Sequence, residues 1–191
     1  MTSTRTRALA VVATVATAAN GSLLDRALIA TPAWNDLGVQ AWAAYSRHAD
    51  LGTGNIVYPI EGILTWIVIF AMAASYLRSD RTVARKAARP VSLAAVGALG
   101  WIGTTIIAAP VMQSVRHLGS DPVALHHAFD VFTLWGVYVR DAFTGLTFLA
   151  CIWTVIEVFR APHAGNATSP VAPASELFPA SRWLRRVTSP R

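Results

Sequence analysis

A stripe of polar and small side chains runs along one face of an apolar stretch late in the chain. Its members, which recur at spacings of three, four or seven residues, are His126, Thr133, Gly136, Arg140, Thr144, Thr147 and Cys151. At about 100° per residue of α-helix, all of them fall within roughly 40° of Arg140. Because a guanidinium that faces lipid is costly, we expect this face to look toward other helices or a water-filled cleft. An ionisable group in such a place is a candidate for a functional site.

These residues support an enzymatic interpretation, with Arg140, His126 and Glu61 as the catalytic residues. His126 or Glu61 takes a proton from a phenol or an activated methylene, and Arg140 stabilises the oxyanion that forms. An aromatic substrate is held by a second set of residues, Trp101, Trp135, Asp25 and Thr144. Molecular oxygen then reacts with the substrate carbanion, so this reaction needs no cofactor.

A non-catalytic interpretation uses the same residues. Here Arg140 pairs with Asp25 or Glu61 to fix the helix register, and the polar stripe holds helices together. The protein then binds a lipid or another hydrophobic ligand, or packs against a partner subunit. A chain this small also allows a homo-oligomer.

Metal binding is the weakest of the three interpretations. His126 and Asp130 are four residues apart and share a helix face, so two ligands could converge. However, the chain has no His-x-x-x-His pair and no cysteine cluster. Ordinary solvated histidines at the start of a helix are the favoured explanation, and we predict no metal site.

The elements that must position these residues are membrane-spanning helices. With 191 residues, 54% hydrophobic content and a mean hydropathy of +0.45, the chain is too apolar for an ordinary soluble domain. Four segments are long and apolar enough to cross a bilayer, at about 8–30, 57–77, 91–112 and 131–159. We therefore predict an all-α bundle of four transmembrane helices over residues 1–160. The remainder, 161–191, is rich in Pro, Ala and Ser and is predicted to be a disordered basic tail.

The net charge of +6 is arranged for a membrane and not for nucleic acid. Twelve basic residues lie before the first span, between the second and third, or after the fourth, and only Arg47 and Arg116 lie in the other two connections. This bias places both termini in the cytoplasm and the 31–56 and 113–130 segments outside. We predict a multi-pass protein of the cell membrane, with the lipid bilayer as its partner and no nucleic acid.

Several local patterns refine this arrangement. Residues 5–19 also resemble a secretory signal peptide, so the first span has a cleaved segment as its alternative. The 31–56 segment, with Trp34, Trp42 and Tyr45, suggests a short helix anchored on the membrane surface by aromatic side chains. In the third span, small residues recur three or four apart and predict close helix packing: Gly97, Gly100, Thr104 and Ala108.

The fourth helix has a clear start. Ser120, Asp121 and Pro122 combine a capping side chain with proline at the first helical position. The helix can then run from 122 to 159, which is much longer than a bilayer requires. The depth of Arg140 in the membrane therefore stays open, either well inside the bilayer or at its external interface.

The arrangement resembles the anthrone oxygenase-like family of small four-helix integral membrane proteins. The matching pieces lie at the ends of helices: Ala30-Thr31-Pro32, Gly54-Asn55-Ile56-Val57-Tyr58-Pro59, Ala109-Pro110-Val111-Met112 and Trp135-Gly136-Val137-Tyr138-Val139-Arg140. The likeness covers most of residues 10–158. It implies a four-helix membrane fold and, as for some members, oxygenation of anthrones to anthraquinones without an evident metal or flavin.

The chain departs from the family at one point. The family's fourth helix commonly reads Trp-Asn-His-x-Arg, whereas here the tryptophan is displaced by one residue and the asparagine and histidine are missing. If the reaction needs a histidine base, this protein must supply it from elsewhere or lack the activity.

Overall fold

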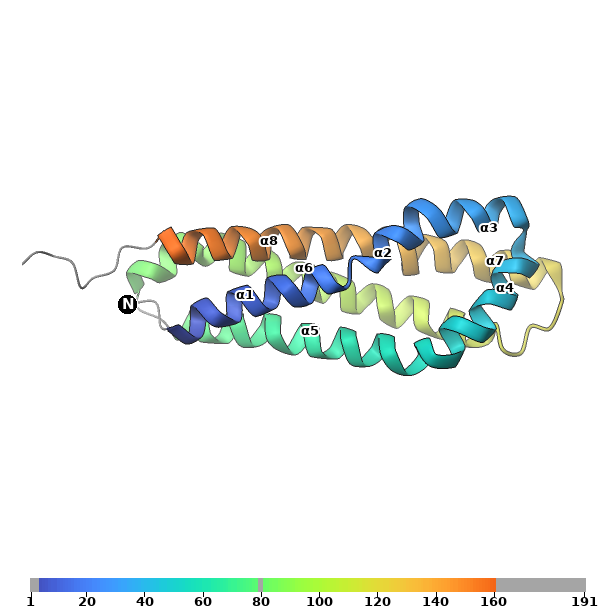
Figure 1. The fold of residues 1–191 in the computed structure, drawn as a ribbon, viewed down its shortest axis with the longest axis horizontal. Helices are drawn as coiled ribbons and strands as arrows, with labels where there is room; N and C mark the ends of the chain where they lie inside the picture. The colour runs from blue at the N-terminus through green and yellow to red at the C-terminus, as the bar shows by residue number, and fades with distance from the viewer. Residues whose placement is uncertain (1–3, 79–80, 161–191) are drawn as a thin grey trace, which may run out of the picture. The chain divides into compact units, whose positions relative to one another are not determined.

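The computed structural model describes residues 4–78 and 81–160, and the predicted tail at 161–191 lies outside the described residues. Within those two ranges the elements are all helical (Figure 1). In chain order they are α1 (Thr4–Ala19), α2 (Ser22–Asp25), the π-helical η1 (Arg26–Ala30), α3 (Thr31–Leu37), α4 (Val39–His48), the π-helical η2 (Ala49–Thr53), α5 (Gly54–Leu77), α6 (Arg81–Ser114), α7 (Pro122–Val131), the π-helical η3 (Phe132–Val139) and α8 (Arg140–Arg160). The predicted all-α class is confirmed for this part of the chain.

Three continuous helical stretches are long and apolar enough to cross a membrane: Val39–Leu77, Ala87–Ser114 and Pro122–Arg160. They contain the second, third and fourth predicted spans and indicate a multi-pass membrane protein. The first predicted span, 8–30, is not one continuous helix. It is interrupted at Asn20 and Gly21, where α1 ends in a turn closed by a hydrogen bond from the Gly21 amide to the Ala18 carbonyl.

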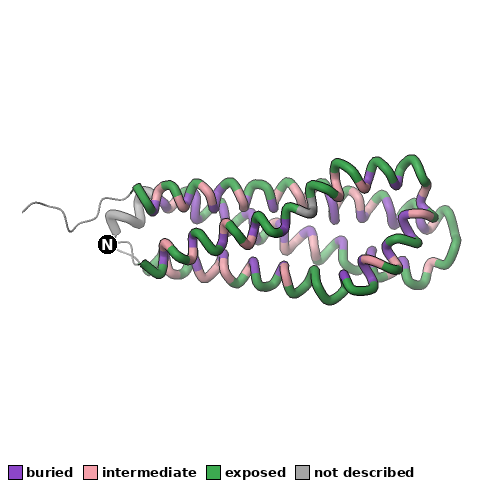
Figure 2. The backbone as a smooth tube through the Cα atoms, in the orientation of Figure 1, coloured by how far each residue is buried: buried purple, intermediate pink, exposed green. Residues whose placement is uncertain are grey.

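Small side chains allow α1, α5, α6 and α8 to pack closely along their lengths. Their shared core includes Ala10 and Ala13 of α1, Ala98 of α6 and Cys151 of α8. On α6, Gly97 is buried, and a Cβ there would strike Thr147 of α8. The predicted packing face of α6 is thus confirmed. Figure 2 shows buried positions recurring along these helices between exposed ones.

A second core joins α3, α4 and α7 to the end of α6. Gly38 has a φ of +88°, a conformation suited to glycine, and it turns α3 back into α4. Trp42 of α4 is fully buried and meets the ring of Phe129 edge-on at 5.2 Å. Trp34 is also buried. The segment does form short helices, but the prediction that these tryptophans anchor it on the membrane surface is wrong, because the indoles fill an interhelical core.

The predicted start of the fourth helix is confirmed. The Asp121 carboxylate accepts hydrogen bonds from the amides of Val123 and Ala124, and Pro122 is the first helical residue. From there the backbone stays helical to Arg160, but η3 is wider than an α-helix. A π-helical stretch holds more residues per turn, so it shifts the helix face that follows it.

This shift alters the predicted polar stripe. Gly136, Thr144, Thr147 and Cys151 are buried as expected. His126 is exposed, and its neighbour Leu125 takes the buried place. The expectation that His126 shares a face with Arg140 fails because it assumed about 100° per residue throughout.

Candidate functional site

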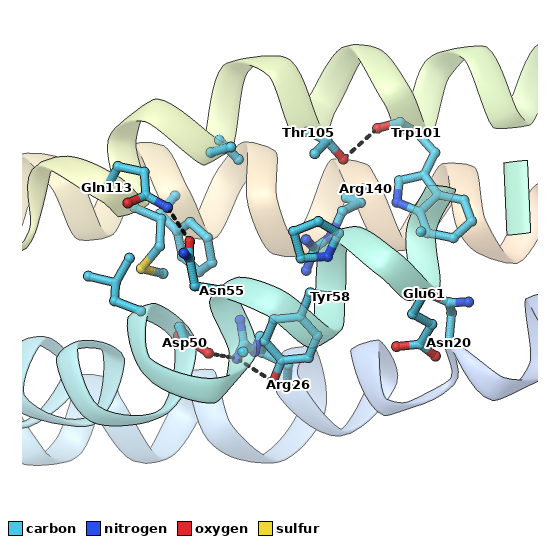
Figure 3. A pocket seen from close by; sticks show the side chains of 18 of the residues that line it. Asn20, Arg26, Asp50, Asn55, Tyr58, Glu61, Trp101, Thr105, Gln113 and Arg140 are labelled. Atoms are coloured by element: carbon cyan, nitrogen blue, oxygen red, sulfur yellow. Dashed lines mark hydrogen bonds and ion pairs between the residues drawn. The ribbon is translucent and has the colours of Figure 1, made fainter. Parts of the chain in front are cut away.

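A cavity of about 390 Å³ lies between α5 and α6, and it is closed on its other sides by η1, η2 and the start of α8 (Figure 3). Apolar side chains such as Ile63, Trp66 and Met112 form much of its wall. Several lining residues on α5 and α6 are exposed, including Tyr58, Pro59 and Ala109. The cavity is therefore reached from the surface between these two helices.

An ion pair joins η1 to η2 at one wall of the cavity. Nη2 of Arg26 donates to Oδ1 of Asp50, and the two side chains are only 12% and 3% exposed. The same nitrogen donates a hydrogen bond of 3.5 Å to the Tyr58 hydroxyl, as Figure 3 shows. The Arg26 guanidinium also faces the rings of Trp34, Tyr58 and Phe132, at 5.9, 5.5 and 6.0 Å from their centroids. The guanidinium of Arg26 is thus paired with a carboxylate and surrounded by aromatic rings of the protein itself.

Arg140 also lines the cavity, but it is placed differently. Its Nε is buried without a hydrogen-bond partner, and among the described residues its guanidinium makes no hydrogen bond and no ion pair within 4.0 Å. The Nη atoms are not among the buried side-chain atoms that lack a partner, and since they have no partner among the described residues, they keep some exposure where Arg140 lines the cavity. Arg26, Asp50 and Asp141 lie near enough for their charges to act on Arg140.

Aromatic rings form the wall on the α6 side. Trp101 is 3% exposed, and Trp66 of α5 meets it edge-on at 5.6 Å between ring centroids. Such a pair gives an apolar wall that suits an aromatic or aliphatic ligand. The sequence predicted that Trp101 holds a substrate, and the structure places its buried side chain in the wall of the cavity.

Polar groups lie at the two ends of the cavity. At one end Nε2 of Gln113 donates a 2.7 Å hydrogen bond to Oδ1 of Asn55, and both side chains are exposed. At the other end Nδ2 of Asn20 donates to Oγ1 of Thr65 at 3.2 Å, and the Glu61 side chain lies nearby (Figure 3). Between these two ends, the arginines and the aromatic rings line the cavity.

The structure brings together four of the seven predicted site residues in the cavity lining: Asp25, Glu61, Trp101 and Arg140. The other three lie outside it. His126 is exposed on α7, Trp135 packs against the second core, and Thr144 donates its hydroxyl to the Arg140 carbonyl at 2.9 Å. The alternative in which Arg140 pairs with Asp25 or Glu61 is not observed.

The sequence analysis missed Arg26, Asp50 and Tyr58 as site residues. The available signal was Arg26 itself, an arginine inside an apolar run that requires a partner. Its partner is 24 positions later, in a segment read as an external loop. Within residues 4–78 and 81–160, no three histidine, cysteine or acidic side chains converge as they would around a metal ion. No protein-family model, curated protein or solved structure matches the chain.

Proposed function

We propose that the protein binds a small, largely apolar molecule in the cavity between α5 and α6. The observation that carries this proposal is the cavity itself, because about 390 Å³ falls within the range of roughly 300–1,000 Å³ that ligand sites occupy. Its walls combine apolar side chains with a few polar groups, which is the usual composition of such sites. The helices beside its opening carry apolar residues on their outer faces, including Ile60, Leu64 and Ile106. A ligand dissolved in the bilayer reaches the cavity from that side.

Filling the cavity tests this proposal. Gly62 lines the cavity, and a Cβ there meets only the Trp66 ring at ordinary contact distance, so Gly62→Leu leaves the helix intact and occupies ligand space. Gly103→Leu is the matched control, since Gly103 has open space around it and does not line the cavity. We expect 11-bromoundecanol to quench the tryptophan fluorescence of the wild type and of Gly103→Leu, but not of Gly62→Leu. Equal quenching of all three proteins would contradict the proposal.

The four-span topology in the cell membrane is part of the same proposal. In it, α1 and the elements that follow it form the first crossing, both termini are cytoplasmic, and the cavity lies toward the external side. The packing of α1 against α5 and α8 supports this arrangement, as does the excess of basic residues at the opposite end. In a chain that carries Cys151→Ala, we expect an impermeant maleimide applied to intact cells to label Ser120→Cys and to spare Arg78→Cys. The reverse labelling would invert the topology.

A cofactor-independent oxygenase is the second candidate, and it rests on the resemblance to the anthrone oxygenase-like family. One observation favours it: Glu61, Arg140 and Trp101, which were predicted as base, oxyanion partner and substrate wall, line the same cavity. Glu61 takes the place of His126 as the base. The substrate methylene loses two hydrogens, one oxygen atom of O₂ becomes its carbonyl oxygen, and the other leaves as water. Purified protein given an anthrone under oxygen should outpace the protein-free blank, and equal conversion would remove this candidate.

A further inference from the structure

Two arginines reach the cavity, but only one of them has a counter-charge in contact. Arg26 is paired with Asp50. Arg140 has no such contact among the described residues, although it lies close enough to Arg26 for the two positive charges to repel each other. The carboxylate next to it in the chain, Asp141, does not line the cavity, and both of its oxygens are buried without a hydrogen bond. The cavity wall therefore carries a cationic group that has no counter-ion in contact among the described residues.

The available atoms of Arg140 suit an oxyanion. A guanidinium presents its N–H groups as a planar fork that matches the oxygens of a carboxylate or a phosphate. In a site walled by Trp66, Trp101 and Ile63, such a contact is stronger than in water. A buried and unpaired charge is costly, so an anion at this point also stabilises the protein.

The rest of the cavity specifies what carries the anion. Its walls are mostly apolar, and its volume of about 390 Å³ is near the lower end for ligand sites, which leaves room for one chain and not for a two-chain phospholipid. We propose that the cavity takes a single-chain amphiphile whose carboxylate or phosphate headgroup binds the Nη atoms of Arg140 while its chain lies against the tryptophans. This inference rests on the proposed binding function and names the ligand class.

The test compares two probes that differ only in the headgroup. The full chain in nanodiscs of zwitterionic lipid is titrated with 11-bromoundecanoate and with 11-bromoundecanol, and quenching of tryptophan fluorescence reports binding. We expect the wild type to bind the carboxylate at least about tenfold more tightly, which is the preference that one charged hydrogen-bonded contact provides. Arg140→Gln should lose this preference and keep its affinity for the alcohol. Arg160→Gln, at the exposed end of the same helix, should retain the preference.

The outcomes separate the two proposals. If the wild type binds both probes equally, the anionic headgroup is overturned while the apolar site survives. If neither probe binds, both proposals fail. Inorganic phosphate and acetate serve as competitors: if either alone displaces the carboxylate as well as undecanoate does, the site takes free anions and not amphiphiles. Should Arg140→Gln fail to fold, the wild-type comparison still decides, and Arg140→Lys should retain part of the preference because it keeps the charge but not the fork.

Discussion

The ion pair between Arg26 and Asp50 permits a quantitative test of how the cavity wall is stabilised. The perturbation is a double-mutant cycle made of Arg26→Met, Asp50→Leu and both substitutions together. Each single variant leaves one charge in a place where the native side chains are 12% and 3% exposed. In Arg26→Met, the Asp50 carboxylate has lost its one partner within the described part of the chain, because its Oδ2 is already buried without one.

The expected magnitudes follow from this burial. Removing one partner of a buried pair costs about 3–5 kcal/mol, so each single variant should lose that much of its free energy of unfolding. Arg26→Met also loses its contacts with three aromatic rings, at about 0.5 kcal/mol or more each. The double variant leaves no charge behind and should be only about 0–2 kcal/mol less stable than the wild type. The coupling free energy is then about 3 kcal/mol or more.

The assay is unfolding of the full chain in mild detergent by titration with sodium dodecyl sulfate, followed by circular dichroism. Glu157→Leu is the control, because it removes an exposed hydrogen bond with Trp153 and should change the free energy of unfolding by less than about 1 kcal/mol. A coupling below about 1 kcal/mol between Arg26 and Asp50 is typical of exposed ion pairs, and it would refute the burial of this pair.

Three further predictions concern packing and turns. Gly97→Ala should destabilise the protein by about 1–3 kcal/mol, since its Cβ would meet α8. Gly103→Ala has open space around its Cβ and should stabilise the protein by up to about 1 kcal/mol. Both changes in the free energy of unfolding are measured by the same titration with sodium dodecyl sulfate. Gly38→Ala should cost about 1–3 kcal/mol in thermal unfolding, because its φ of +88° strains any residue with a Cβ. Arg47→Gln loses its hydrogen bonds to the carbonyls of Val115 and Gly119 and should raise amide hydrogen exchange in residues 115–121 by about tenfold or more, and unchanged exchange would contradict its role in holding this turn.

Hydropathy and helix signals predicted most of the helical framework. The apolar runs that became α5, the later part of α6 and α8 are long enough to be read without ambiguity. The start of α7 at Asp121 was predicted because a helix start is marked by local residues, here one capping side chain and one proline at the first helical position. The break after α1 was not predicted, since Asn20 is satisfied by Thr65 of another helix, a contact that no local pattern contains.

The site was predicted only in part, for a related reason. Arg140 was found because an arginine in an apolar helix must face inward. Its surroundings depend on η1 and η2, which bring Arg26 and Asp50 together across 24 positions. The 31–56 segment was predicted to lie on the membrane surface because tryptophans are typical of membrane anchors. Tryptophans are equally suited to burial in a core, and here they fill the second core.

The π-helical segment η3 explains why both the helix faces and the site were predicted only in part. Ahead of it, α7 turns Leu125 and Phe129 toward α4 and closes the second core. After it, α8 carries Thr144, Thr147 and Cys151 along the buried face of the bundle. A regular α-helix through 132–139 would keep one face throughout, and it would put His126 where Leu125 lies. The π-helical segment thus allows one long helix to serve two cores that lie on different faces. It also sets Arg140 at the junction between them, where the cavity lies and where no hydrogen bond or ion pair from the described residues reaches its guanidinium.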